Sequence, residues 1–99
     1  MYGSYGAEQS FSLAATWFSK AAEQGDATAQ ASLGILYESG KGVRQSHEEA
    51  VGWFQKAADL GDAAAQISLS LKYKKGEGVS QSDKKAEYWR RKAGASKKD

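Results

Sequence analysis

The sequence predicts an all-α fold, a short right-handed α-α superhelix (solenoid) of antiparallel helix pairs. Three observations predict it. The 99-residue chain repeats itself with a period of 36 residues, and its apolar residues recur at the spacing of one helical face. It has 11 glycines and no proline, so glycine alone interrupts the helices. Two-helix units of this length bury their apolar faces only against neighbouring units, which makes a solenoid.

The repeat is plain when residues 14–49 are written above residues 50–85, because 19 of the 36 aligned positions are identical. A third, partial copy begins at Ala86 as "AEYWRRKAG". The tryptophans and the lysines that follow them share one position in every copy: Trp17, Trp53, Trp89, Lys20, Lys56 and Lys92. We therefore expect about two full repeats plus a C-terminal capping helix.

We divide the chain into one repeat domain, 1–99. Gly6 aligns with Gly42 and Gly78, so residues 1–9 are interpreted as the remnant of a preceding inter-repeat loop. The remaining segments are repeat 1 (10–45), repeat 2 (46–81), and a partial repeat 3 with a basic tail (82–99).

The first helix is expected near residues 10–24. Ala14, Trp17, Phe18 and Ala21 recur at positions i, i+3, i+4 and i+7, which lie on one helical face. Because the tryptophans share this apolar face in each copy, we expect them in the core. Gly25 ends the helix, since only glycine enters the left-handed conformation cheaply.

The second helix is expected at 27–39, with Asp26 as its N-cap. It carries two apolar stripes, and a helix that is apolar on two sides is packed between neighbours. The stripes are Ala29, Leu33, Tyr37 and Ala27, Ala31, Ile35. Gln30 and its copy Gln66 lie among alanines and are expected to satisfy backbone groups.

The same features place the remaining helices near 46–60, 63–75 and 82–94. Ser46 and Glu49 form a capping-box pattern at the start of the third helix. Ser82 takes the same capping position in the fifth. Toward the carboxyl end apolar positions become polar: Lys72 replaces Leu36 and Arg90 replaces Phe54. A terminal unit needs a polar outer face, so this pattern predicts a true end of the stack.

The segment "WFSKAAEQGDATAQASLGILYESGKGV" resembles the Sel-1-like repeat, a relative of the tetratricopeptide repeat. The resemblance runs from about Gly6 to Ala93. It rests on the period, the Trp-Phe-x-Lys-Ala-Ala run, the Ala-x-Ala-Gln run and the Leu-Tyr-x-x-Gly-x-Gly-Val tail. The family implies a curved scaffold that holds protein partners, and it implies no chemistry.

Residues for catalysis or metal binding are scarce. The chain has no cysteine and one histidine, His47, so no thiolate site, triad or zinc site can form. The loop "LYESGKGV" lacks the spacing of a phosphate-binding loop, and Glu77 replaces its Lys41 in the second copy. We therefore expect no enzyme activity and no cofactor, and the sequence shows no leader and no membrane span.

The expected function is that of a non-catalytic scaffold or adaptor that binds a partner segment in a concave groove. In tetratricopeptide-like stacks the first helix of each pair lines this groove. The positions opposite the tryptophan face differ between copies, as position-specific contacts or simple drift at a solvent face would make them. They are Thr16, Ser19, Glu23, Gly52, Gln55, Asp59, Tyr88 and Arg91. Lys20 and Lys56 border this surface, and the recurrence of lysine in the three copies indicates either stems packed over aromatic neighbours or a basic ladder for acidic groups.

The charge of the chain is unevenly distributed. Its net charge of +2 combines a net −4 over residues 1–66 with a net +6 over residues 67–99. The alternative function is therefore a charge-driven binder of nucleic acid or an anionic membrane through the basic C-terminal third. At the amino end no second helix precedes the first one, so that face is expected to pack on upstream repeats or to form a homodimer.

Overall fold

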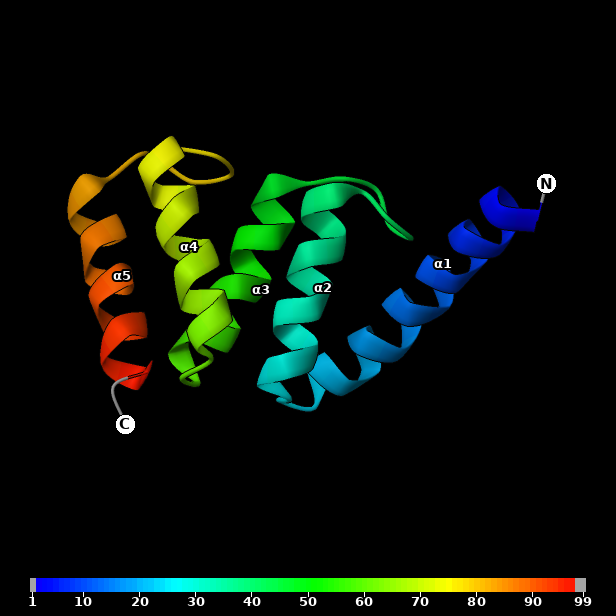
Figure 1. Ribbon diagram of the computed structural model, residues 1–99, viewed down its shortest axis with the longest axis horizontal. Helices are drawn as coiled ribbons and strands as arrows, with labels where there is room; N and C mark the ends of the chain where they lie inside the picture. The colour runs from blue at the N-terminus through cyan, green and yellow to red at the C-terminus, as the bar shows by residue number, and fades with distance from the viewer. Residues whose placement is uncertain (1, 98–99) are drawn as a thin grey trace.

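The computed structural model describes residues 2–97, with side chains from residue 10 to residue 95, and within these residues it consists of five helices and no strand. The helices are α1 (Tyr2–Glu23), α2 (Ala27–Ser39), α3 (His47–Asp59), α4 (Ala63–Lys75) and α5 (Asp83–Lys97) (Figure 1). The bounds of α2 and α4 are the predicted ones, and α3 differs by one residue at each end.

Each helix packs against the next one along the chain, so the helices stand side by side in a row (Figure 1). The row measures 45 × 27 × 22 Å. The predicted all-α solenoid of antiparallel helix pairs is confirmed. In Figure 1 the amino-terminal half of α1 leans away from α2, whereas the other helices stay close to their neighbours.

The first helix is longer than the sequence indicates. It begins at Tyr2, so residues 2–9 are helical and the expectation of a loop remnant over residues 1–9 is wrong for them. Met1 lies outside the described residues. The position equivalent to the start of α3 at His47 is Phe11, deep inside α1. The division of the chain into repeats stays a prediction.

The predicted N-caps are present. Asp26 and Asp62 accept hydrogen bonds from the backbone amides of Ala29 and Ala65, at 3.0 Å and 2.8 Å. Ser46 accepts from the amide of Glu49 at 3.1 Å. A capping box would also have the Glu49 side chain accept from the Ser46 amide, and this part of the prediction is wrong. The Ser46 amide donates to the carbonyl of Tyr37 instead, at 2.9 Å.

The loop glycines are structural, as the repeat of the loop predicts. Gly42 and Gly78 have φ values of 77° and 73°. A Cβ at Gly42 would lie 2.2 Å from the Phe11 carbonyl oxygen, and one at Gly78 would lie 2.3 Å from that of His47. Each loop therefore rests directly on the backbone of a first helix, and only glycine leaves room for this contact.

The core runs between the helices, with Leu33, Phe54 and Leu69 almost fully buried. Two buried glutamines tie consecutive helices together, as expected. The amide nitrogen of Gln30 donates to the carbonyl of Ala22, and the Gln66 amide nitrogen donates to that of Ala58, both at 3.1 Å. The same carbonyls accept from the backbone amides of Gly25 and Gly61 at 3.0 Å, so each glutamine adds a second hydrogen bond at the end of α1 or α3.

The tryptophans are buried to different extents, and the expectation that all three lie in the core is wrong for Trp17. Trp89 is 8 % exposed, Trp53 is half-buried, and Trp17 is 67 % exposed. Trp53 packs against the cluster of Ala22, Ala29 and Leu33, and Trp89 belongs to the main core cluster. No preceding helix in the described residues covers Trp17.

One apolar stripe of the second helices is also less covered than predicted. Leu33 and Leu69 are buried, but Ile35, Ile67 and Leu71 are 53 %, 39 % and 52 % exposed. The second stripe is therefore covered only in part: Ala31 is buried in the main core cluster, whereas the larger side chains Ile35, Ile67 and Leu71 are exposed.

Candidate functional site

The predicted partner-binding positions belong to α1, α3 and α5, and most of them are exposed. Ser19 and Gln55 are half-buried, and the other members are exposed. We call this set the first-helix row. It consists of Thr16, Ser19, Lys20, Glu23, Gly52, Gln55, Lys56, Asp59, Tyr88 and Arg91.

Lysines of this row lie over aromatic rings, as the recurrence of lysine in the three copies predicts. The ammonium nitrogens of Lys20 and Lys56 lie 5.5 Å and 4.6 Å from the ring centres of Trp17 and Trp53. Cation–π contacts of this kind hold the aliphatic part of a lysine against the ring while the charge stays near solvent. The row therefore presents ordered positive charge.

The α5 end of the row is the most structured part. Tyr88 is 54 % exposed, and its ring meets that of Trp89 edge-on, with centroids 5.0 Å apart at an interplanar angle of 85°. Lys92 donates a hydrogen bond to the Tyr88 hydroxyl at 3.3 Å and lies 5.4 Å from the Tyr88 ring centre. The tyrosine ring is thus held in one orientation by a buried tryptophan and a lysine.

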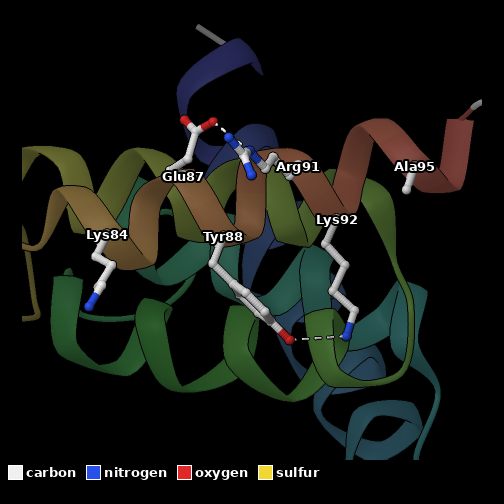
Figure 2. A pocket seen from close by; sticks show the side chains of 6 residues that line it. All are labelled: Lys84, Glu87, Tyr88, Arg91, Lys92 and Ala95. Carbon is white, nitrogen blue, oxygen red and sulfur yellow. Dashed lines mark hydrogen bonds and ion pairs between the residues drawn. The ribbon is translucent and has the colours of Figure 1, made fainter.

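An open cavity of about 640 Å³ lies over these residues (Figure 2). Figure 2 shows Lys84, Tyr88 and Lys92 pointing to one side of α5, and Glu87 and Arg91 pointing to the other. We call this hollow the α5 cavity. Its lining is Lys84, Glu87, Tyr88, Arg91, Lys92 and Ala95, of which the sequence analysis singled out Tyr88, Arg91 and Lys92.

A compact ion cluster forms one wall of the α5 cavity. Arg90 and Arg91 donate to the carboxylate of Glu87 through their Nε atoms, at 3.0 Å and 2.8 Å. The hydrogen bonds from Arg90 and then from Arg91 hold the pKa of Glu87 at about 2, well below its ordinary value. The carboxylate therefore stays charged and offsets part of the positive charge of the two arginines.

The positions of α3 that are equivalent to Glu87 and Arg91 are partly covered. Val51 and Gln55 take the positions of Glu87 and Arg91, and both are half-buried. Val51 packs against the core cluster that includes Trp89. The outer face of α5 carries charged residues at these positions instead, as the replacement of Phe54 by Arg90 predicts.

A second cavity, of about 280 Å³, lies between α4 and α5. The corresponding place between α2 and α3 is filled by the ring of Phe54. Phe54 is fully buried against Gly34, whose added Cβ would lie 2.7 Å from the ring. The matching residues are Arg90, which turns outward to Glu87, and Ser70, whose hydroxyl donates to the carbonyl of Ala86 at 2.8 Å. The cavity is lined by Ser70, Lys74, Asp83, Ala86, Glu87 and Arg90.

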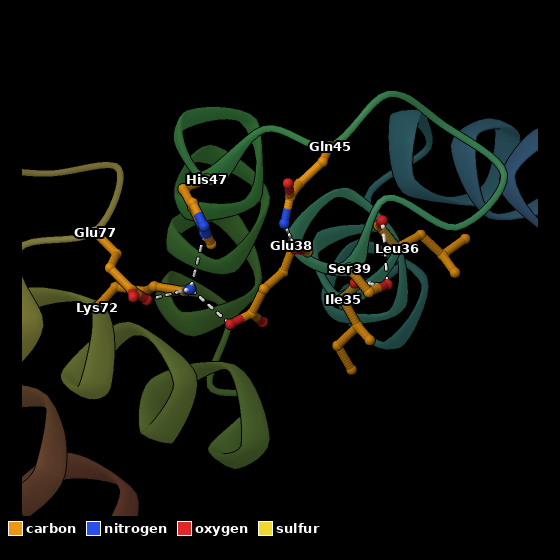
Figure 3. Close-up of polar contacts among 8 residues, drawn as sticks. All are labelled: Ile35, Leu36, Glu38, Ser39, Gln45, His47, Lys72 and Glu77. Carbon is orange, nitrogen blue, oxygen red and sulfur yellow. Dashed lines mark hydrogen bonds and ion pairs between the residues drawn. The ribbon is translucent and has the colours of Figure 1, made fainter.

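A buried charge cluster joins the two repeats on another face (Figure 3). Lys72 is 2 % exposed, so its interpretation as part of a polar outer face is wrong. Its ammonium group lies 2.5 Å from the carboxylate of Glu38 and 3.1 Å from that of Glu77. It also lies 3.2 Å from Nδ1 of His47, which is half-buried rather than solvated. We call these four residues the Lys72 cluster.

The Lys72 cluster replaces an apolar group of the first copy. Leu36 is buried at the position of Lys72, and Lys41 lies 5.1 Å from the ring centre of Phe11. Lys41 and Phe11 occupy the positions of Glu77 and His47. Three differences between the copies thus replace a buried leucine and a cation–π pair with an ionic cluster. This concerted change is the signal from which the cluster could have been found.

The described residues contain no group of three or more side chains able to hold a metal ion. None of the described helices is both long and apolar enough to cross a membrane. Ser82 acts as a helix cap, because its hydroxyl accepts from the amide of Lys85 at 3.2 Å.

The Sel1 repeat family model matches residues 1–26, 27–62 and 63–97. The second and third matches begin at the first residues of α2 and α4, so they divide the same period at a different point from the repeats proposed above. No sequence among the curated proteins matches this chain.

Three solved structures are similar to the chain. A Sel1 repeat protein from Oxalobacter formigenes is 39% identical with a TM-score of 0.84, covering 86% of this chain and 35% of its own. The protective antigen c5321 of uropathogenic Escherichia coli, which displays the same fold, is 40% identical with a TM-score of 0.79, and the match covers 81% of this chain and 17% of the antigen. Helicobacter pylori cysteine rich protein B is 30% identical with a TM-score of 0.81, and the match covers 84% of this chain and 62% of that protein. The chain thus spans less than two thirds of the length of each.

Proposed function

The chain belongs to the Sel1 repeat family, and from this premise we propose that it is a non-catalytic adaptor that binds a segment of a partner protein along the first-helix row. Proteins of this family are generally scaffolds for protein–protein interaction. The α5 cavity is the observation that carries the proposal. It is an open hollow of about 640 Å³ along the exposed face of α5, at the end of the row, and it includes an exposed tyrosine that its neighbours hold in place. Tyrosine and arginine are the residues that most often dominate binding energy at protein interfaces.

The row itself supports a position-specific contact. Equivalent positions carry Thr16, Gly52 and Tyr88 in the three copies, while the tryptophan one residue later and the alanine two residues earlier are the same in every copy. Gly52 has open space beside it, with no atom within 4 Å of an added Cβ. A partner segment lying along the row would meet a flat surface at α3 and the projecting tyrosine at α5.

A capture experiment tests this proposal. The protein is immobilised, partners are captured and identified by mass spectrometry, and the variant Gln55→Ala/Asp59→Ala/Arg91→Ala serves as the comparison. We expect the partner to be lost in this variant while its circular dichroism stays that of the unmodified protein. Equal capture by both proteins, or capture of the same partner by the unfolded chain, would contradict the proposal.

Binding of nucleic acid or an anionic membrane through residues 72–98 receives less support. Lys72 is buried and paired with two carboxylates, and Glu87 engages both arginines of α5. The positive charge that reaches solvent is therefore smaller than the net charge of the segment suggests. Such binding would weaken steeply with salt, which separates it from a contact made by shape.

We also propose that the bare face of α1 packs on a helix of the α2 or α4 type, supplied by preceding repeats or by a second copy. Within the chain, α2 covers Trp53 and α4 lies beside Trp89, whereas Trp17 and Leu13 are 67 % and 61 % exposed. Sedimentation of this chain tests the second-copy form. A stable dimer that Trp17→Ala dissociates supports it, and a well-folded monomer at micromolar concentration excludes it.

A further inference from the structure

The charge of the α5 cavity indicates the chemistry of its partner. Lys84, Arg91 and Lys92 line it, against the single carboxylate of Glu87. That carboxylate is already hydrogen-bonded to Arg90 and Arg91, which offset its negative charge. Lys84 extends beside Tyr88 without a contact to the other residues drawn in Figure 2. The net field at the cavity favours a negatively charged ligand.

Apolar contact is available in the same hollow. The ring of Tyr88 and the methyl group of Ala95 are both part of its lining. The tyrosine loses little conformational entropy on binding, because Trp89 and Lys92 already fix its ring. A ligand that combines carboxylates with an apolar side chain would therefore use both features of the cavity.

We infer that the α5 cavity binds an acidic segment of a partner protein, in which carboxylate side chains flank an apolar one. The carboxylates pair with Lys84 and Lys92, which lie on the same side of α5 as Tyr88, and the apolar side chain packs on Tyr88 and Ala95. This inference rests on the proposed function, since it names the chemistry of the segment that ends at this point of the first-helix row.

The geometry favours a protein segment over a nucleic acid or a lipid surface. A hollow of about 640 Å³ with an aromatic wall receives side chains, whereas a phosphate backbone or a bilayer is bound by a continuous field of cations. On α5 that field is interrupted, because Glu87 lies between the cations of the two sides of the helix.

Fluorescence anisotropy with two labelled synthetic peptides tests the inference on the intact chain. One peptide alternates glutamate and leucine, and the other carries glutamine in place of every glutamate. We expect the acidic peptide to bind and the glutamine peptide to bind at least about tenfold more weakly. Equal affinity for the two peptides would overturn the inference.

Matched variants locate the binding. Lys84→Glu and Arg44→Glu make the same change of charge on exposed side chains, the first inside the cavity and the second in the loop before α3. We expect Lys84→Glu to weaken the acidic peptide on the order of tenfold and Arg44→Glu to leave it within about twofold. Equal weakening by both would show a response to net charge alone and would overturn the inference.

Tyr88 supplies a second readout. We expect Tyr88→Phe to bind the acidic peptide nearly as well as the unmodified protein, and Tyr88→Ala to bind it on the order of tenfold more weakly. Circular dichroism and thermal unfolding of Tyr88→Ala verify that it is folded at the assay temperature. Unchanged binding by a folded Tyr88→Ala would contradict an aromatic contact in the cavity.

The remaining outcomes separate this inference from the proposed function. Tighter binding of single-stranded DNA or phosphatidylserine vesicles than of the peptide, with loss in Lys84→Glu, would assign the cavity to another class of ligand. A partner protein that is captured by Lys84→Glu but lost when Gln55 and Asp59 are changed would overturn the cavity assignment alone. In that case the first-helix row would remain the binding surface.

Discussion

The ammonium group of Lys72 lies 2.5 Å from the carboxylate of Glu38, and this contact joins the second helices of two consecutive repeats. The lysine is 2 % exposed and is held by Glu77 and His47 as well. A buried ammonium group is stable only when such partners compensate for its lost hydration. The four residues therefore form one unit, and a change in any of them affects the others.

The coupling inside the Lys72 cluster can be measured with its counterpart in the first copy. Lys72→Leu alone should lower the free energy of unfolding by about 1–2 kcal/mol, because it leaves two half-exposed carboxylates without their cation. The triple variant His47→Phe/Lys72→Leu/Glu77→Lys recreates the group of Phe11, Leu36 and Lys41 and should recover most of this loss. Urea unfolding of the triple variant and of the three single variants His47→Phe, Lys72→Leu and Glu77→Lys gives the comparison. Loss in the triple variant equal to the sum of the single losses would contradict the coupling.

The Lys72 cluster should also make stability depend on pH at both extremes. A hydrogen bond from Lys72 lowers the pKa of Glu77 below its ordinary value of 4.5, so this contribution is present above that value and is lost as the pH falls through the folded-state pKa. Burial acts to lower the pKa of Lys72, but hydrogen bonds to Glu38 and Glu77 outweigh it and raise the pKa above 10.5. That contribution is complete below 10.5 and is lost as the pH rises through the raised value.

We therefore expect the stability difference between the unmodified protein and the triple variant to be flat between about pH 5 and pH 10 and to change outside that range. Thermal unfolding followed by circular dichroism across the pH range measures it. A difference that changes steadily between those limits would show that other groups control it.

Substituting alanine for each of two helical glycines should change the free energy of unfolding in opposite directions. Gly52 lies in α3 with no atom within 4 Å of an added Cβ, so Gly52→Ala should stabilise the protein by up to about 1 kcal/mol through helix propensity. Gly34 lies in α2, and its added Cβ would meet the Phe54 ring at 2.7 Å, so Gly34→Ala should destabilise by about 1–3 kcal/mol. Chemical denaturation of the pair checks the signs. Stabilisation by both would show that the core beside Phe54 adapts freely.

The cavity between α4 and α5 should accept the ring that its counterpart holds. Arg90→Phe with Ser70→Gly reproduces Phe54 against Gly34 and should raise the free energy of unfolding by about 1–2 kcal/mol, because an aromatic side chain becomes buried. Arg90→Phe alone should gain less, since the Ser70 side chain occupies part of the space. Thermal unfolding of both variants tests this. A double variant no more stable than the single one would mean that the cavity does not receive the ring.

The three tryptophans should differ in their contribution to stability although the sequence treats them alike. Trp89→Ala removes a side chain that is 8 % exposed and should lower the free energy of unfolding by about 3–5 kcal/mol. Trp17→Ala removes one that is 67 % exposed and should lower the free energy of unfolding of a monomer by less than about 1 kcal/mol. Equilibrium unfolding at two protein concentrations measures both. A large, concentration-dependent loss for Trp17→Ala would instead reveal a partner on the α1 face.

The helices, their caps and their order could be predicted because each depends on residues close together in the chain. Asp26 and Ser46 cap the helix that directly follows them, and Gly42 is required by the backbone it touches. The exposed positions of the first-helix row followed from helical spacing for the same reason. Of the residues that line the α5 cavity, the sequence pattern singled out only Tyr88, Arg91 and Lys92. Lys84, Glu87 and Ala95 have no distinguishing pattern in the sequence.

What the sequence determined by itself is the repeat, and with it the solenoid and the kind of residue at each position. The tertiary structure decided which copies of a position are covered, and this made Trp17 exposed and Trp89 buried. It also decided that Lys72, a cation at an apolar position, turns inward to Glu38 and does not face solvent. The physical reason is that burial and charge pairing depend on neighbours a whole repeat away, and a 36-residue period says nothing of whether such a neighbour is present.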